Sequence, residues 1–201
     1  MIYLASRSPR RRELLAQIGV RFEPLMFREG LRVDGDVDEA VREGESPDEY
    51  VRRVTRVKCD AGWKRIKQRR GLMPLPVLAA DTTVAVEKQI LGKPADREEA
   101  AQMLRLLSGR SHRVLTAVAV SFEEKFQMAV SESTVTFEAL DDSRIRAYVE
   151  SGEPFDKAGA YGIQGRAGAF VARLEGSYSG VMGLPLRETA QLLRKFGIVV
   201  P

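Results

Sequence analysis

Short apolar runs alternate along the chain with stretches whose apolar side chains recur at helical spacing. Apolar runs of strand length lie at residues 2–5 and 77–80. Residues 112–122 and 126–140 alternate apolar and polar side chains, as two antiparallel strands joined by a short turn do. Another strand is expected at 170–174. The pattern therefore predicts strands separated by helices along the chain.

Each long helix is predicted to begin at a capping residue. Ser8 is followed by Pro9 and then by apolar residues at helical spacing, which is typical of a helix start. Ser46 and Glu49 form a capping box at the start of a longer helix, and Asp96 begins a third.

The segments between these elements vary in regularity. Residues 20–27 predict a second strand, and the polar residues 28–45 predict a loop. Two more helices are expected after Asp141 and from Pro185, whereas 178–183 is expected to be irregular.

The helix that begins at Ser46 carries a lysine in an unusual position. Its predicted apolar stripe consists of Tyr50, Val54, Val57 and Ala61. At about 100° per residue, Lys58 falls at the inward edge of this stripe. Such a lysine either extends along the core with its ammonium in water or meets a buried anion.

Composition places few limits on function. The 201 residues carry a net charge of +4, which fits an anionic ligand. The single Cys59 excludes an internal disulfide framework and suits a reducing compartment. The lone His112 has no partner histidine, so we expect it to be structural. No apolar run approaches the roughly 18 residues of a membrane span, and the first basic cluster follows an apolar stretch instead of preceding it. We therefore expect one domain over 1–201, a cytoplasmic location and no membrane partner.

The beginning of the chain is suited to anion binding. A strand, a turn with Ser6 and Ser8, and a helix start with free N–H groups follow one another there. The same stretch contains four arginines: Arg7, Arg10, Arg11 and Arg12.

Three further polar residues occupy positions typical of functional sites. Asp81 directly follows the run 77–80 and is expected at the carboxyl end of a strand, where ligands gather in open α/β sheets; alternatively it caps a turn. Lys93 stands in a tight Gly-Lys-Pro turn. Gln164 lies in the glycine-rich segment 156–168, and its amide can donate and accept at once, which suits the edge of a base.

Together these residues suit a polyphosphate substrate. Phosphates would be neutralised by Arg10, Arg11, Lys58 and Lys93. Glu39 and Asp81 offer carboxylate oxygens to a hard divalent cation, and a metal with a carboxylate can activate water for attack on phosphorus. The chain has no Walker A motif and no nucleophilic elbow, which favours direct hydrolysis by water over a covalent intermediate.

An ordered set of short motifs resembles the Maf family over nearly the whole chain. The motifs are Ala5 to Arg11, Val37 to Glu39, Lys58, Ala80 to Thr82, Gly92 to Pro94, Leu107 to Gly109 and Asp156 to Gly165. Each is weak alone, but their order is highly specific. Maf-like proteins are house-cleaning nucleotide pyrophosphatases that cut nucleoside triphosphates between the α- and β-phosphates with a divalent metal.

The resemblance implies a fold and a set of site residues. The implied fold is α/β, with a mixed elongated sheet flanked by helices and two lobes around a central cleft, similar to inosine triphosphate pyrophosphatases and often homodimeric. Asp81 matches the family's proton acceptor, and with Glu39 it would hold Mg²⁺ or Mn²⁺. The residues that match substrate-handling positions are Ser6, Arg10, Arg11, Lys58, Thr82, Lys93 and Gln164.

Substrate choice follows from three of these matches. Arg10, Thr82 and Gln164 stand at the positions associated with it. The Gly-Ile-Gln-Gly sequence around Gln164, together with Thr82, resembles the branch that hydrolyses dTTP and UTP. The alternatives are the same hydrolysis of another nucleotide such as 7-methyl-GTP, a nucleic-acid-binding module, or a septum-regulating protein. A nucleic-acid partner is not expected, because the basic residues 6–12 lie between a predicted strand and an amphipathic helix.

Overall fold

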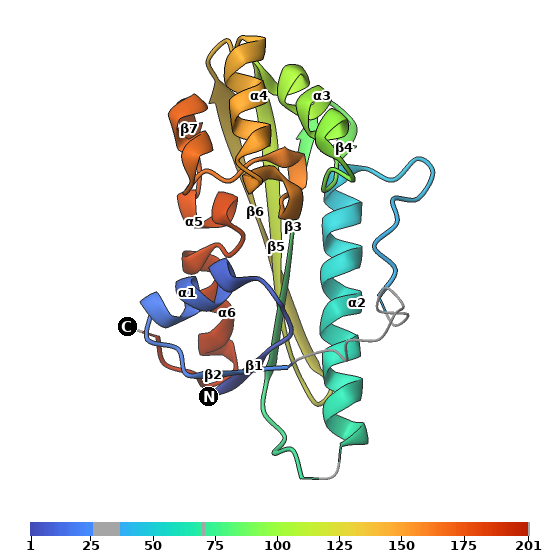
Figure 1. Ribbon diagram of the computed structural model, residues 1–201. Helices are drawn as coiled ribbons and strands as arrows, with labels where there is room; N and C mark the ends of the chain where they lie inside the picture. Colours follow the sequence, from blue (N-terminus) through green and yellow to red (C-terminus); the bar gives the residue numbers. More distant parts are fainter. Residues whose placement is uncertain (26–36, 70, 201) are drawn as a thin grey trace.

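A mixed sheet forms the centre of the molecule. The computed structural model describes residues 1–25, 37–69 and 71–200, and these supply seven strands in the order β2-β1-β3-β5-β6-β7, with β4 paired to β3 (Figure 1). The strands are β1 (Ile2–Leu4), β2 (Phe22–Pro24), β3 (Val77–Val86), β4 (Gln89–Leu91), β5 (Ser111–Phe122), β6 (Lys125–Phe137) and β7 (Val171–Glu175). The predicted mixed α/β fold is confirmed.

Three long antiparallel strands make up most of the sheet. β5 and β6 pair along their whole length, which confirms the predicted hairpin. β1 lies parallel to β3 only at its beginning, where Leu4 pairs with Leu78, and β4 pairs with β3 from Val84 onward. In the described part of the chain, the stretch of β3 between these two points has no strand on that edge. Polar side chains there are available to a site.

Asp81 lies in the middle of a strand and not at its end. β3 continues past Ala80 to Val86, because Asp81 and Thr82 keep their antiparallel pairing with β5. The prediction that a strand ends at residue 80 is therefore wrong. This strand tolerates polar residues because it borders the cleft described below.

Helices flank the sheet on both sides. They are α1 (Pro9–Gln17), α2 (Pro47–Gln68), α3 (Arg97–Leu107), α4 (Asp142–Glu150), α5 (Tyr178–Met182) and α6 (Leu186–Lys195), with 3-10 turns at Glu153–Asp156, Ala158–Ala160 and Arg166–Phe170. The predicted caps are confirmed, since the side chains of Ser8, Ser46 and Asp96 accept hydrogen bonds from first-turn N–H groups. Asp141 caps α4 in the same way. None of the helices in the described ranges is long and apolar enough to cross a membrane.

Two predicted segments differ from the elements that the structure shows. Residues 178–183, expected to be irregular, contain helix α5, because the Ser177 hydroxyl caps it by accepting a hydrogen bond from the Gly180 N–H group at 3.0 Å. The predicted strand 20–27 is β2. Residues 26–27 of the predicted strand and 28–36 of the predicted loop 28–45 lie outside the described residues.

α2 packs against the sheet through small side chains. Its buried face consists of Pro47, Val51, Val54, Thr55, Cys59, Gly62 and Ile66. The predicted stripe is wrong apart from Val54, because its other members are only partly buried: Tyr50, Val57 and Ala61. A Cβ atom at Gly62 would lie 2.8 Å from the Val77 Cγ1 atom, so the helix approaches β3 more closely than a larger residue would permit. Lys58 lies at the inward edge of this face, as predicted, with 16% of its side chain exposed.

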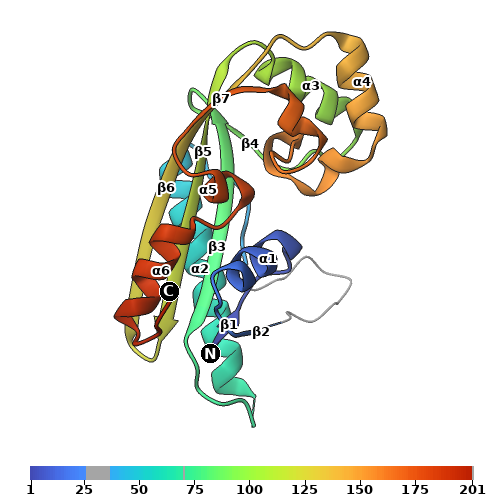
Figure 2. The ribbon, with the colours of Figure 1, turned by 90° about the vertical axis from the view of Figure 1, so that its left-hand side faces the viewer.

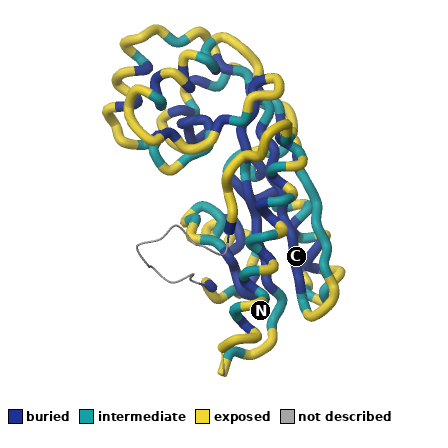
Figure 3. Tube along the Cα trace, turned by 90° about the vertical axis from the view of Figure 1, so that its right-hand side faces the viewer, coloured by how far each residue is buried: buried dark blue, intermediate teal, exposed yellow. Residues whose placement is uncertain are grey.

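The two largest hydrophobic cores among the described residues lie in different lobes. One core joins one end of β3 and β5 to α3, α4 and residues 158–170. The other joins β1, α1 and α6 to the opposite end of β3 and β5. Figure 2 shows α3 and α4 above one end of the sheet and α1 near the other. In Figure 3 the buried positions follow the strands into both lobes. The predicted two-lobed arrangement is confirmed.

His112 belongs to the first of these cores. Only 2% of the residue is exposed, its Nε2 atom lies 2.8 Å from the Tyr161 hydroxyl, and its ring meets the rings of Phe137 and Tyr161 edge to face. Burial lowers the pKa of the His112 imidazole to about 4. The residue is therefore neutral at pH 7 and structural, as the sequence predicts.

This buried histidine makes stability depend on pH. Below its unfolded pKa of about 6.5 the unfolded chain binds a proton that the native core excludes, so acidification from pH 7 to pH 5 should cost about 2 kcal/mol of unfolding free energy. Urea titrations at the two pH values measure this cost. In His112→Asn the same acidification should cost about 2 kcal/mol less; an equal loss in both proteins would contradict the prediction.

Candidate active site

A single cleft between the lobes collects the predicted site residues. It has a volume of about 640 Å³ and is lined by residues of both lobes. Every residue that the sequence proposed for the site lies along it: Ser6, Arg10, Arg11, Glu39, Lys58, Asp81, Thr82, Lys93 and Gln164. The structure therefore brings together side chains that are far apart in the sequence.

An ammonium between two carboxylates lies on one wall of this cleft. The Lys58 Nζ atom is 2.7 Å from Asp81 Oδ1 and 2.8 Å from Glu39 Oε1. Lys58 comes from α2, Asp81 from the middle of β3, and Glu39 from the segment before α2. The Asp81 side chain is 12% exposed and that of Glu39 48%. Of the two interpretations of Lys58, the structure supports the one in which it meets an anion.

The charge of Glu39 is stabilised by its surroundings. Burial alone would raise the pKa of its carboxyl group. The charge and hydrogen bond of Lys58, with smaller contributions from Lys93 and Arg11, outweigh burial and hold that pKa below its ordinary value. Glu39 is therefore an anion at neutral pH, as a ligand for a hard cation must be.

Arg11 is held in place by three oxygen atoms. Its Nε atom donates to the Gly183 carbonyl at 2.7 Å, while its Nη1 and Nη2 atoms donate to the hydroxyls of Ser6 and Thr82, each at 3.2 Å. Burial lowers the pKa of the Arg11 guanidinium, and the nearby Asp81 opposes this effect. The guanidinium stays charged and keeps one orientation toward the cleft.

Thr82 is oriented by a second threonine. The Thr116 hydroxyl lies 2.7 Å from the Gly180 carbonyl oxygen and 3.0 Å from Thr82 Oγ1. A hydroxyl has one proton. Thr116 directs this proton at both acceptors, the Gly180 carbonyl and Thr82 Oγ1. Thr82 Oγ1 also accepts from Arg11.

Arg10 reaches across the cleft to the other lobe. Its Nη1 atom lies 3.2 Å from Asp156 Oδ2, and Asp156 also pairs with Lys157. Burial would raise the pKa of Asp156, but these two cations outweigh it and lower that pKa. An anion that binds to Arg10 must therefore compete with Asp156.

Lys93 and Gln164 line the cleft from neighbouring segments of the other lobe. Lys93 follows β4, and Gln164 lies between two short 3-10 turns. The Gly159 N–H group donates to the Gly92 carbonyl at 3.0 Å and so joins the two segments. At Gly159 φ is +68°, and a Cβ atom would lie 2.8 Å from Val84 Cγ1. The close approach to β3 therefore requires glycine.

Glu39 and Asp81 are two carboxylates of the cleft that could hold a divalent cation. Within the described ranges, no group of three or more His, Cys, Asp or Glu side chains lies together as a metal site. Glu39 and Asp81 nevertheless converge on one point, Lys58 Nζ. Mg²⁺ commonly binds through one or two carboxylates plus substrate phosphates and water. This donor set suits a metal that arrives with a phosphorylated substrate.

Several contributing residues were missed in the sequence. Tyr50, Thr116 and Asp156 all take part in the hydrogen bonds or ion pairs around the cleft. Tyr50 comes eight residues before Lys58, so the two side chains lie about 80° apart around α2. Thr116 and Asp156 act through partners distant in the chain. No local pattern identifies Thr116, whereas Asp156 begins the motif 156–165.

Similar known proteins identify the family of this chain. Residues 1–196 match the family described as Maf-like protein. The chain belongs to the Maf family. A relative from Aromatoleum aromaticum, named dTTP/UTP pyrophosphatase, is 58% identical over 197 residues, 98% of this chain and 95% of the relative. One of the same name from Dechloromonas aromatica is 55% identical over 197 residues, 98% of this chain and 97% of the relative.

A solved structure was also matched. The Ham1 protein of Staphylococcus aureus aligns with 97% of this chain and 96% of its own, at 17% identity and a TM-score of 0.47. That likeness is too weak to bear on the site of this Maf protein.

The contact between Gly159 and β3 yields a prediction about the wall that carries Gln164. In Gly159→Ala the positive φ costs about 1 kcal/mol, and the overlap with Val84 adds roughly 1–3 kcal/mol. Gly152→Ala is a matched control, since Gly152 has φ +77° and no atom within 4 Å of an added Cβ. Urea denaturation should show the Gly159 variant to be the less stable; equal stabilities would contradict the close packing.

Proposed function

We propose that this protein hydrolyses nucleoside triphosphates between the α- and β-phosphates, with dTTP and UTP as preferred substrates. The products are a nucleoside monophosphate and pyrophosphate. The observation that carries the proposal is the position of Asp81, paired with Lys58 beside Glu39 in a cleft lined by cations. The names of the relatives, which are 52–58% identical, support the choice of substrates.

Asp81 is proposed as the general base. A water molecule transfers a proton to the Asp81 carboxylate while its oxygen forms a bond to the α-phosphorus, and the bond from that phosphorus to the bridging oxygen breaks. Pyrophosphate leaves with the bridging oxygen. The Lys58 ammonium, 2.7 Å from Asp81, pairs with the carboxylate and orients it before the substrate binds.

The remaining cations neutralise the substrate and its leaving group. Arg11, fixed by Ser6 and Thr82, would bind phosphate oxygens from one lobe, and Lys93 would bind them from the other. Glu39 and Asp81 would hold Mg²⁺ or Mn²⁺, which supplies further charge neutralisation when bound.

Substrate choice is assigned to three residues at the edges of the cleft. Gln164 can donate to and accept from one edge of a nucleobase. Arg10 and Thr82 line the same cleft, where Arg10 pairs with Asp156 and Thr82 accepts from Arg11. A house-cleaning role and a homodimer stay predictions that rest on the family, and a cytoplasmic location stays a prediction that rests on the sequence.

The first test removes the base. Asp81→Asn keeps the shape of the side chain and its acceptor for Lys58 but cannot take a proton, so pyrophosphate release from UTP should fall by about 100-fold or more. Products are identified by chromatography with Mg²⁺ or Mn²⁺, and Asp60→Asn on the exposed side of α2 is the control. Near-wild-type release by Asp81→Asn would exclude this role. Release of orthophosphate and UDP by the wild type would show that another bond is cut.

The second test concerns recognition of the nucleobase. Gln164→Ala removes the amide, and the ratio of kcat/KM for UTP over that for CTP should fall roughly tenfold, as the loss of one or two hydrogen bonds predicts. Gln102→Ala, on the exposed face of α3, should leave the ratio unchanged. An unchanged ratio in the Gln164 variant as well would count against base recognition by this residue.

A further inference from the structure

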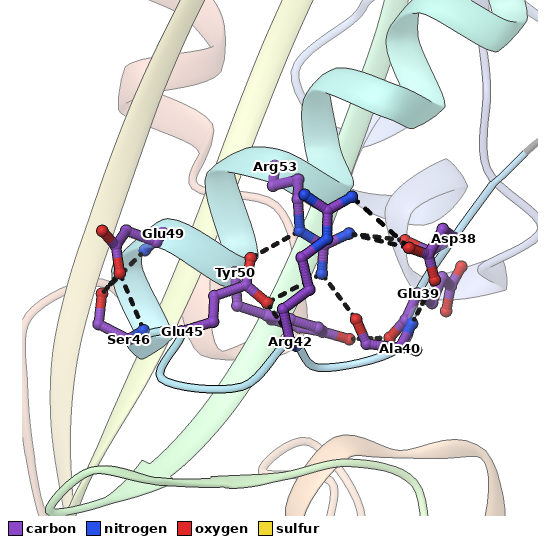
Figure 4. A network of polar contacts seen from close by, with 9 residues as sticks. All are labelled: Asp38, Glu39, Ala40, Arg42, Glu45, Ser46, Glu49, Tyr50 and Arg53. Carbon is purple, nitrogen blue, oxygen red and sulfur yellow. Dashed lines mark hydrogen bonds and ion pairs between the residues drawn. The ribbon is translucent and has the colours of Figure 1, made fainter.

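The segment that carries Glu39 is bound to α2 through three consecutive backbone carbonyls. The Arg53 Nη1 atom donates to the Asp38 carbonyl at 2.9 Å, the Tyr50 hydroxyl to the Glu39 carbonyl at 3.0 Å, and the Arg53 Nη2 atom to the Ala40 carbonyl at 2.7 Å. Figure 4 shows both side chains directed from the helix at this segment. The backbone on each side of Glu39 is thereby fixed relative to α2.

Arg53 is itself held by a carboxylate. Its Nε atom donates to Glu45 Oε1 at 2.6 Å and its Nη2 atom to Glu45 Oε2 at 2.9 Å. Only 15% of the Arg53 side chain and 7% of the Glu45 side chain are exposed. A forked ion pair has few alternative geometries, and this one is partly buried. Glu45 therefore sets the plane of the guanidinium that binds the two carbonyls.

Glu39 depends on this clamp for its position. Residues 37–46 form no helix or strand, so regular backbone pairing does not place the Glu39 carboxylate beside Lys58 and Asp81. Contacts from α2 place it instead. Arg53 and Tyr50 hold the backbone of the segment, and Lys58 binds the Glu39 carboxylate at 2.8 Å. The distance from Glu39 to Asp81 is then set by how α2 packs on β3.

We propose that Arg53 is a positioning residue for the metal-binding carboxylate Glu39. It fixes the segment 38–40 so that Glu39 and Asp81 face a common divalent cation, and it does not itself touch the substrate. This inference rests on the proposed function, because that function provides the reason for a cation at this point.

The shape of arginine, more than its charge, is required for this role. The guanidinium presents separate donors in a rigid fork, which here reach two carbonyls and both oxygens of Glu45. A lysine carries the same charge but all its donors on one nitrogen atom, so it cannot span these partners. Arg53→Lys therefore changes the geometry of the clamp while keeping its charge.

The test compares two arginines of the same helix. Arg52→Lys is the control, because Arg52 is 49% exposed and pairs only on the surface with Asp48. Mn²⁺ binding is measured by electron paramagnetic resonance with α,β-methylene-UTP, so that no turnover is needed. Arg53→Lys should weaken Mn²⁺ binding about tenfold, as substitutions behind a metal ligand do, and Arg52→Lys should leave it within about twofold.

Steady-state kinetics provide the second readout. In Arg53→Lys the Mg²⁺ concentration for half-maximal pyrophosphate release should rise about tenfold, with recovery of kcat at high Mg²⁺ and little change in KM for UTP. Tyr50→Phe, which removes one hydroxyl, should show the same effect at roughly two- to fivefold. It keeps the test decisive if Arg53→Lys does not fold.

Two outcomes would overturn the inference. One is Mn²⁺ binding in Arg53→Lys and Tyr50→Phe equal to that of Arg52→Lys, and the other is an absence of Mn²⁺ binding by the wild type. Failure of the proposed function is distinct from both: the wild type would then release no pyrophosphate from any triphosphate, while the comparison of Mn²⁺ affinities would still test the clamp.

Discussion

The ammonium of Lys58 between two carboxylates is the interaction on which this site depends. Glu39 and Asp81 come from different elements, and the Lys58 ammonium pairs with both of them in the cleft. The ammonium reaches them because α2 packs unusually close to β3 through small residues such as Gly62. A larger side chain at that contact would move Lys58, and with it both carboxylates. The packing of one helix thus sets the chemistry of the cleft.

Cations on both lobes make the cleft a receptor for an extended anion. Arg11 is fixed by Ser6, Thr82 and Gly183 and needs little reorganisation when a phosphate arrives. Arg10 differs, because its ion pair with Asp156 spans the two lobes and must be shared with any phosphate it binds. Arg11 is therefore preorganised for a phosphate. A phosphate that binds Arg10 would weaken the ion pair between the lobes.

Local signals in the sequence predicted local features well. Caps such as Ser46 and the hairpin of β5 and β6 follow from neighbouring residues, and the helical wheel placed Lys58 on the inward side of α2. The errors share one cause. Asp81 was assigned to a strand end, and the buried face of α2 to Tyr50, Val57 and Ala61. Both predictions used residue type alone, without knowledge of the tertiary contacts. Pairing with β5 continues β3 through Asp81, and the packing of α2 on the sheet turns Thr55, Cys59 and Gly62 inward instead. The Arg53 clamp and the Arg10–Asp156 pair join distant or irregular segments, and no periodicity encodes them. The ordered family motifs supplied the site residues that periodicity alone could not.

The stereochemistry of hydrolysis tests the central claim most directly, namely that water attacks the α-phosphorus in one step without a covalent intermediate. One diastereomer of the α-thio analogue of UTP is hydrolysed in water labelled with heavy oxygen, and the configuration of the product is determined. A single in-line displacement predicts inversion, with the label in the nucleoside thiomonophosphate. Retention, which requires two displacements through an enzyme-bound nucleotide, or recovery of the label in pyrophosphate would contradict the account.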